Sequence, residues 1–348
     1  MEVAIIGGGN FGTAIANIAA SNGYTTYLWM RDEHQVAECV THRENRRYLP
    51  GHRLDDRVVP TADLATALER SSVILMTVPS ASFRRVSEQL ARFTDPDDVI
   101  VSATKGIERH AGGAGFLLMS QILEELVPGE RIGVLSGPNL AEEIADRQYS
   151  GTVVASRDPG VCDAVREVLK SDTFRVYENG DLYGVELAGA LKNIYAIVCG
   201  LAGGLGVGNN TIAMLVTRSL AEMSRFAVSL GANPFTFLGL AGVGDLLVTC
   251  SSPLSRNYQL GFRLAQGQTL EEAQESLGKL AEGVNTLRVI YERARELDVY
   301  MPLATGLHRV LFDGESLAVV VHELMTGGQP LDVEFARPEP GSAGSPLR

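Results

Sequence analysis

Three glycines near the start of the chain constrain the fold more than any other feature of the sequence. Gly7, Gly9 and Gly12 form the pattern Gly-x-Gly-x-x-Gly, directly after the apolar run 3–6 and at the start of an amphipathic segment over residues 11–21. A strand, a glycine turn and a helix in this order are typical of a dinucleotide-binding βαβ unit. The first glycine permits a tight turn, the second lets the backbone approach a pyrophosphate, and the third lets the helix pack on the sheet.

The pattern of apolar residues predicts two halves of different architecture. In the first half, continuous apolar runs alternate with longer amphipathic segments, and we expect strands over residues 3–6, 25–29, 72–77, 98–103, 133–136 and 151–156. Continuous apolar runs indicate strands buried on both faces, so we predict an α/β fold with a doubly wound, mostly parallel, Rossmann-like sheet. In the second half helical periodicity replaces the strands, over residues 182–198, 211–230, 255–266, 269–277, 284–298 and 302–312.

These patterns divide the chain into three parts. We expect a dinucleotide-binding domain over residues 1–180 and an all-helical substrate domain over residues 181–330. Pro, Gly and Ser dominate the end of the chain, and this composition predicts a disordered tail over residues 331–348.

Composition and charge argue against several classes of function. The net charge is −12, from 42 acidic and 30 basic residues, which disfavours a surface for nucleic acid or anionic membranes. The longest apolar stretch, residues 194–207, is interrupted by glycines and is too short to span a bilayer, and the N-terminus does not have the pattern of a signal peptide. The four cysteines are scattered and the six histidines form no cluster, so we expect neither disulfides nor a metal site. A cytoplasmic, globular protein is the expectation.

The residues after the second predicted strand bear on the choice of cofactor. An acidic residue at this position favours the free ribose hydroxyls of NAD, whereas an arginine favours the 2′-phosphate of NADP. Arg31 here precedes Asp32. The sequence therefore favours NADP(H) and leaves NAD(H) open.

Lysine is scarce in this chain, and two of the four lysines lie in informative places. The other 26 basic residues are arginines, which cannot release a proton near neutral pH. Lys105 follows the predicted strand 98–103, at the edge of the sheet where ligands bind, although a solvated loop lysine would fit the same pattern. Lys192 lies inside an apolar helical segment, where burial would lower its pKa and prepare it for proton transfer. A lysine that extends its amine from an apolar helix to solvent is the alternative for Lys192.

Two turns are candidates for binding an anionic substrate. Ser255 is a natural helix N-cap, so the amides of Arg256 and Asn257 would form a helix N-terminus suited to a phosphate, and the Arg256 guanidinium adds donors. Capping alone would also explain Ser255. After the predicted strand 133–136, a Gly-Pro turn leads to Asn139, which we expect to cap a helix or to donate its amide to a ligand.

Together these segments resemble the bacterial-type NAD(P)-dependent glycerol-3-phosphate dehydrogenases. The resemblance extends in order over residues 1–330 and includes Gly-x-Gly-Asn-Phe-Gly-Thr-Ala at 7–14, Tyr-Leu-Pro-Gly at 48–51, Thr-Lys-Gly-Ile-Glu at 104–108, Ser-Gly-Pro-Asn-Leu-Ala-Glu-Glu at 136–143, Gly-Ala-Leu-Lys-Asn at 189–193, Gly-Val-Gly-Asp-Leu at 242–246, Ser-Arg-Asn at 255–257 and Ala-Glu-Gly at 281–283. It implies reversible reduction of dihydroxyacetone phosphate by NAD(P)H to sn-glycerol 3-phosphate, which would feed phospholipid synthesis. The oligomeric state is left open, with a homodimer as one option.

The resemblance also implies a role for individual residues. Lys192 would donate or accept the proton, and the residues around the substrate would be Lys105, Gly137, Asn139, Lys192, Asp245, Ser255, Arg256 and Asn257. The cofactor would be bordered by Gly7, Gly9, Asn10, Phe11, Gly12, Arg31, Lys105, Ala141, Arg256, Leu280 and Glu282. This chain departs from the common residues of the family at three of these positions, where Phe11 replaces tryptophan, Asn139 replaces serine and Leu280 replaces valine.

Two other functions would share parts of this pattern. A β-hydroxyacid or ketopantoate-type dehydrogenase has the same plan and a catalytic lysine but binds a carboxylate, whereas the Ser-Arg-Asn helix start fits a phosphate better. A redox-sensing protein that binds NAD(P) without chemistry would not need Lys192, Asp245 and Arg256 together.

Overall fold

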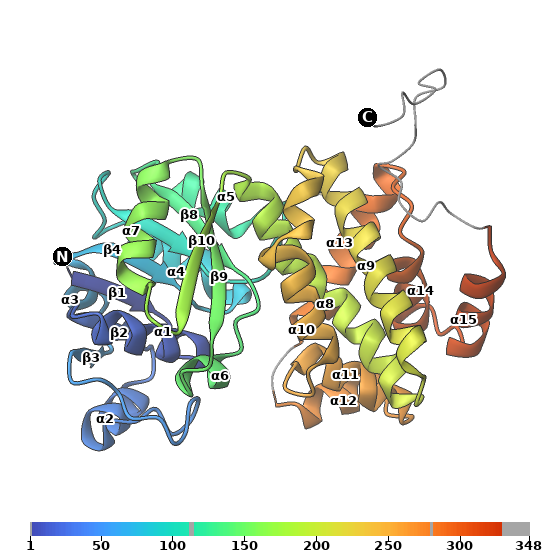
Figure 1. Cartoon of the computed structure of the whole chain (residues 1–348), viewed down its shortest axis with the longest axis horizontal. Coiled ribbons are helices and arrows are strands. Elements are labelled where there is room, and N and C mark those ends of the chain that lie inside the picture. The colour runs from blue at the N-terminus through green and yellow to red at the C-terminus, as the bar shows by residue number, and fades with distance from the viewer. Residues whose placement is uncertain (1, 111–114, 279–280, 329–348) are drawn as a thin grey trace, which may run out of the picture.

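The N-terminal half of the protein is built on one eight-stranded sheet. The computed structural model describes residues 2–110, 115–278 and 281–328 (Figure 1). The strands follow the order β10-β9-β8-β5-β4-β1-β2-β3, and every neighbouring pair is parallel except β8 with β9. Their bounds are β1 Glu2–Ile6, β2 Thr26–Trp29, β3 Val58–Thr61, β4 Ser71–Met76, β5 Val99–Ser102, β8 Ile132–Ser136, β9 Ser150–Ser156 and β10 Phe174–Asn179. The predicted doubly wound, mostly parallel sheet is confirmed.

Helices cover both faces of this sheet, which explains the continuous apolar runs of its strands. Val3 and Ile5 of β1 pack with Ile15 on one face, while Ala4 and Ile6 belong to the cluster on the opposite face. The helices of this half are α1 Asn10–Ser21, α2 Glu33–His42, α3 Leu64–Leu68, α4 Ser80–Leu90, α5 Met119–Leu126, α6 Ala141–Ala145 and α7 Pro159–Leu169. Strands β1 and β4 lie next to each other where the strand order reverses, and ligands bind at the carboxyl ends of such strands.

Four strands were not predicted from the sequence. Strands β3 and β10 are the two edges of the sheet, where one face is less covered and the apolar run is therefore interrupted. The other two, β6 Ile107–Arg109 and β7 Phe116–Leu118, form a separate two-stranded antiparallel sheet. Leu118 is part of the hydrophobic core of the C-terminal half, so this small sheet packs against the helices.

The C-terminal half is helical, as predicted, and is organised around α8 (Figure 1). Its elements are α8 Leu182–Gly204, α9 Asn209–Ser229, η1 Pro234–Leu238, η2 Leu240–Gly244, α10 Asp245–Ser251, α11 Arg256–Ala265, α12 Leu270–Ser276, α13 Glu282–Glu296, α14 Pro302–Phe312 and α15 Leu317–Thr326. Residues of α8 make close contact with α11, since a Cβ atom on Gly200 would lie 2.0 Å from the Tyr258 carbonyl oxygen. The tail predicted over residues 331–348 lies outside the described residues.

Helix α8 extends to Gly204, six residues beyond the helix predicted over residues 182–198. It has 23 residues and is the one helix among residues 2–110, 115–278 and 281–328 with the length and hydropathy to cross a membrane. In this structure 94% of its apolar window is buried inside the protein. Its hydrophobicity is therefore accounted for by its place at the centre of the helical core.

Candidate active site

The glycine turn between β1 and α1 has the geometry expected of a dinucleotide site. Gly7 adopts a φ of 127°, and a Cβ atom on Gly12 would lie 2.0 Å from the Gly7 carbonyl oxygen. A Cβ atom on Gly9 would meet nothing within 4 Å, so the turn is open at the point where the backbone would approach a phosphate. The first turn of α1 contains no acidic residue and has no side-chain cap, which leaves its positive end suited to an anion.

Two lysines share one buried carboxylate at the junction of the two halves. The Lys105 Nζ atom donates to Asp245 Oδ2 at 2.6 Å and to the Gly137 carbonyl oxygen at 3.1 Å. The Lys192 Nζ atom donates to the other carboxylate oxygen of Asp245 and to Thr249 Oγ1, the latter at 2.7 Å. Because two ammonium groups surround one carboxylate, the group can retain a positive charge that attracts an anion.

The environment of Lys192 lowers the pKa of its amine. The side chain is buried, and burial lowers the pKa of Lys192 to about 7. The Asp245 carboxylate opposes this shift, and the nearby Lys105 ammonium adds to it. A general acid or base works best when its pKa lies near the operating pH, and Lys192 meets this condition.

A turn of π-helix places Asp245 at this point. The η2 segment ends at Gly244, and α10 begins directly at Asp245. A Cβ atom on Gly242 would lie 2.2 Å from the Phe237 carbonyl oxygen, so only glycine permits this close approach. One helical turn later, Thr249 donates its hydroxyl to the Asp245 carbonyl oxygen at 2.6 Å and presents its lone pairs to Lys192.

The predicted phosphate site lies at the start of α11. Ser255 is the N-cap, and its hydroxyl accepts a hydrogen bond from the Tyr258 amide at 3.3 Å, as expected. Arg256 is exposed in the first turn, which carries no acidic residue. The Asn257 side chain is buried: it donates to Asn193 Oδ1 at 3.0 Å and accepts from the Gly283 amide at 3.1 Å. The Asn257 side chain therefore ties α11 to α8 and α13, and any contact with a ligand would come from its backbone amide.

Glu282 links the two halves beside this centre. Its carboxylate accepts hydrogen bonds from the Ser80 amide at 3.4 Å and the Ser80 hydroxyl at 3.2 Å. Burial raises the pKa of Glu282, while the Ser80 donors and the charges of Arg256 and Lys105 lower it. Leu280, the neighbouring residue assigned to the cofactor, lies outside the described residues.

Arg31 does not lie in this cluster. It lines a separate cavity of about 420 Å³ beyond the carboxyl end of β2, together with Trp29, Arg85 and Arg92. No acidic residue lines this cavity among the described residues, so the three guanidinium groups form a positively charged rim. This arrangement suits a phosphate group.

The remaining predicted site residues border the glycine turn or the end of β8. Asn10 is exposed at the start of α1 and donates to Glu142 Oε1 at 3.2 Å, and Phe11 packs against the sheet core. Ala141 begins α6. Asn139 does not cap that helix, because the N-cap is Leu140. The Asn139 Nδ2 atom instead donates to Thr152 Oγ1 at 3.0 Å.

Two polar atoms near the end of β8 have no partner within the described structure. Asn139 Oδ1 is buried without a hydrogen bond, and so is Ser136 Oγ at the end of the same strand. Buried polar atoms are nearly always satisfied, so these two have unused capacity to accept a hydrogen bond, as do Ser87 Oγ and Thr94 Oγ1 elsewhere in the described structure. The two atoms near β8 fit the cofactor or substrate that the glycine turn and the lysine pair would hold.

Two residues of this site were not predicted from the sequence, Thr249 and Asn193. Thr249 contacts Lys192, and Asn193 contacts Asn257. Thr249 lies four residues after Asp245, and Asn193 follows Lys192 directly, so helical spacing could have indicated Thr249. No group of three or more His, Cys, Asp or Glu that could hold a metal ion occurs within residues 2–110, 115–278 and 281–328.

Comparison with known proteins identifies what this arrangement is similar to. Residues 2–162 match the family described as NAD-dependent glycerol-3-phosphate dehydrogenase N-terminus, and residues 181–322 match its C-terminus. Proteins named glycerol-3-phosphate dehydrogenase [NAD(P)+] from Teredinibacter turnerae and Azotobacter vinelandii are 53% and 55% identical, over 96% of this chain and 97% and 96% of theirs. The crystal structure of glycerol-3-phosphate dehydrogenase from Coxiella burnetii has a TM-score of 0.87 and 35% identity, and the match covers 94% of this chain and 99% of that one.

Proposed function

This chain belongs to the NAD(P)-dependent glycerol-3-phosphate dehydrogenase family, and on that premise we propose that it reduces dihydroxyacetone phosphate to sn-glycerol 3-phosphate, preferably with NADPH. It is an oxidoreductase that uses a nicotinamide cofactor. One observation supports the reaction most directly, which is the pair of lysines on Asp245 next to the α11 N-terminus. A hydroxyacid dehydrogenase or a cofactor sensor is disfavoured because both halves of the chain match this family.

In the proposed mechanism Lys192 is the general acid for reduction. The glycine turn between β1 and α1 would hold the nicotinamide cofactor, which would supply a hydride for the carbonyl carbon, and negative charge would then develop on the carbonyl oxygen. The Lys192 ammonium donates a proton to that oxygen, and the Lys105 ammonium stabilises the charge before the proton arrives. Asp245 orients both ammonium groups, and in the oxidation direction the neutral Lys192 amine takes the proton back.

The α11 N-terminus is proposed to hold the substrate phosphate. Arg256 and the first amides of the helix would bind the dianion and fix the distance between the carbonyl group and Lys192. Ser255 shapes this turn as its N-cap. The Asn257–Asn193 hydrogen bond ties this helix to α8 next to Lys192, so the phosphate site and the proton donor are held on packed helices.

The cavity lined by Arg31, Arg85 and Arg92 supports the preference for NADPH. Its position beyond the carboxyl end of β2 is where the ribose 2′-position lies in this kind of domain. Asp32, the acidic candidate for binding the 2′-hydroxyl, caps α2 by accepting from the His34 amide at 3.0 Å. Asp32 also pairs with Arg47 at 3.0 Å, so its carboxylate is already used.

The absorbance of NADPH and NADH at 340 nm tests this proposal. We expect a fall that depends on dihydroxyacetone phosphate and is faster with NADPH at equal, subsaturating concentrations. Arg31→Ser should raise KM for NADPH by ~10-fold or more through loss of a charge-assisted hydrogen bond, and change KM for NADH by less than ~2-fold.

Arg70 provides the matched control for this substitution. It is exposed but lies just before β4, at the amino ends of the parallel strands, whereas Arg31 follows the carboxyl end of β2, so Arg70→Ser should leave both KM values unchanged. Equal effects of Arg31→Ser on the two cofactors would contradict the proposed role. No oxidation of either cofactor by folded protein would refute the reaction itself.

The pH dependence of the two directions should have opposite signs. Reduction requires the Lys192 ammonium, so kcat/KM for reduction should decline by about tenfold per pH unit once the pH rises above about 7. Oxidation requires the neutral amine and should rise through the same range. Initial rates in both directions between pH 5.5 and about 9 would measure this, and the second ionisation of the substrate phosphate, near pH ~6, is expected to add a titration of its own.

Thr249 offers a matched pair of variants for this profile. Thr249→Val removes the hydroxyl that accepts from Lys192 and thereby destabilises the ammonium, so the decline in reduction should move to lower pH. Thr249→Ser keeps the hydroxyl and should keep the profile. A profile that is the same in both variants and in the parent protein would exclude Lys192 as the titrating group.

A further inference from the structure

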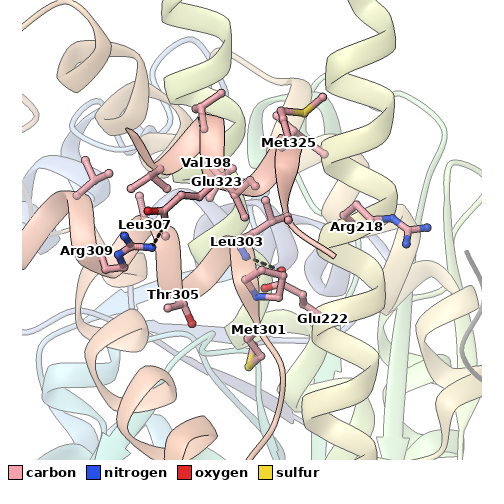
Figure 2. A pocket seen from close by; sticks show the side chains of 18 of the residues that line it. Val198, Arg218, Glu222, Met301, Leu303, Thr305, Leu307, Arg309, Glu323 and Met325 are labelled. Atoms are coloured by element: carbon pink, nitrogen blue, oxygen red, sulfur yellow. Dashed lines mark hydrogen bonds and ion pairs between the residues drawn. The ribbon is translucent and has the colours of Figure 1, made fainter. Parts of the chain in front are cut away.

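A large cavity lies away from the proposed active site. It measures about 810 Å³ and is formed by the end of α8, by α9, α14 and α15, and by the turn 298–301 before α14 (Figure 2). Neither Lys192 nor Asp245 lines it. We call this cavity the C-terminal cleft.

The C-terminal cleft has an apolar floor and exposed apolar walls. Leu303 and Leu307 of α14 are buried at its base, where Glu222 accepts the backbone amides of Leu303 and Ala304 and thereby satisfies the start of α14. By contrast, several large apolar side chains of its walls are open to solvent: Leu205 is 53% exposed, Met214 42%, Val321 43%, Leu324 39% and Met325 65%. An apolar patch of this kind usually marks a surface that another segment covers.

Positive charge lies along one side of the C-terminal cleft. Arg218 and Arg225 project from α9, and Arg295 lies at the end of α13. On the other side Glu323 of α15 is paired with Arg309 at 2.7 Å (Figure 2). Arg225 also donates to the Tyr300 carbonyl oxygen. In all, four arginines and three acidic residues, Glu222, Asp298 and Glu323, line the C-terminal cleft, so its rim carries a small excess of positive charge around an apolar interior.

The sequence that follows α15 has the complementary pattern. Gly327 and Gly328 are themselves lining residues, so the chain leaves the described structure inside the cleft. Residues 331–335 read Leu-Asp-Val-Glu-Phe, in which apolar and acidic residues alternate. In an extended segment, alternate side chains point to opposite sides, so Leu331, Val333 and Phe335 share one side while Asp332 and Glu334 share the other.

We propose that residues 331–335 of the same chain bind in the C-terminal cleft as an extended segment. The three apolar side chains enter the cleft between α9 and α15, and the two carboxylates lie along the rim near Arg218 and Arg225. Only two residues separate Gly328 from Leu331, and a chain of this length spans at most ~10 Å, so the segment starts next to its site. Within the tail predicted to be disordered over residues 331–348, Pro, Gly and Ser are concentrated in residues 337–346 and are missing from 331–335.

Charge favours this segment over a second copy of the same surface. A symmetric dimer formed through the C-terminal cleft would pair it with a second surface of the same composition, which has the same small excess of positive charge. The segment 331–335 instead adds two negative charges where the arginines lie. The segment 331–335 also has apolar side chains that can cover the apolar floor of the cleft. A small inorganic anion has no such groups.

Photo-cross-linking in the full-length protein tests the proposal. In Phe335→p-benzoylphenylalanine, irradiation should attach position 335 to peptides of α9, α14 or α15, where Met214, Met301 and Met325 are available to react. The control is Leu347→p-benzoylphenylalanine, placed in the Gly- and Ser-rich end, which should attach to these peptides at least ~10-fold less often. Similar yields from both positions would overturn the proposal.

A pair of added charges tests the predicted side of the segment. Val333→Asp places a carboxylate among apolar side chains and should lower the cross-linking yield from position 335 by ~5-fold or more. Ala336→Asp adds the same charge on the other side and should lower the yield by less than ~2-fold. Equal losses would overturn the alternating orientation.

The product mass identifies the occupant. Cross-links within one chain are expected, whereas covalent dimers as the main product would assign the cleft to a second copy and overturn the proposal. An apolar small molecule retained in the native mass spectrum, without cleft cross-links from position 335, would overturn it as well.

Discussion

Lys192→Ala is expected to lower turnover by at least ~10² in both directions, because it removes the group proposed to donate and accept the proton. Cofactor affinity should be retained, since Lys192 lies on α8 and the glycine turn is formed by β1 and α1. The measurements are steady-state kcat for both directions and the Kd of NADPH from its fluorescence. Turnover within twofold of the parent protein would remove Lys192 from the mechanism.

Two further substitutions separate proton transfer from charge. Lys192→Arg keeps a cation next to Asp245 but cannot release a proton near neutral pH, so it should remain as impaired as the alanine variant. Lys170 is exposed at the end of α7, and Lys170→Ala should leave kcat unchanged. Substantial activity in Lys192→Arg would mean that positive charge alone suffices at this position.

Arg256→Leu is expected to raise KM for dihydroxyacetone phosphate by ~10² or more, through loss of charge-assisted hydrogen bonds to the phosphate. Because a loosely held substrate is also misplaced relative to Lys192, kcat should fall as well. Assays with dihydroxyacetone, which lacks the phosphate, give the diagnostic comparison: the parent protein and the variant should reduce it at similar, low rates.

Arg263 is a matched control on the same helix. It lies two turns later, in the last turn of α11, so Arg263→Leu removes the same charge away from the helix N-terminus. Its KM for dihydroxyacetone phosphate should match that of the parent protein. An equal rise in KM for both variants would indicate a general effect of charge, and would contradict a phosphate site at Arg256.

Sequence reasoning predicted the parts of the fold that depend on local pattern. The glycine turn, the sheet strands buried on both faces and the Ser255 cap all follow from a few adjacent residues. Strands of three residues, as in β6 and β7, contain too few positions to show a period, and edge strands such as β10 are only partly apolar. Their positions depend on tertiary packing, which a local pattern does not contain.

The candidate site was predictable in its residue types but not in its connections. Burial of Lys192 followed from its apolar neighbours, and the structure shows it buried. The Asp245 carboxylate bridges Lys192 and Lys105, which lie 53 and 140 positions away from it in the sequence. No sequence pattern indicates contacts at such separations. The same holds for Asn139, whose amide reaches across to Thr152 of the neighbouring strand instead of the helix next to it.

The shared carboxylate also makes the acidity of the proton donor sensitive to the arrangement of the two halves. Lys105 comes from the loop after β5, whereas Lys192 and Asp245 come from α8 and α10. The charge of Lys105 lowers the pKa of Lys192, so a hinge motion that separated the halves would raise that pKa and hold the proton more tightly. Burial and the charge of Lys105 both lower the pKa of Lys192, so any motion that closed the halves would make the proton easier to release, and the strength of the acid would depend on the separation of the halves.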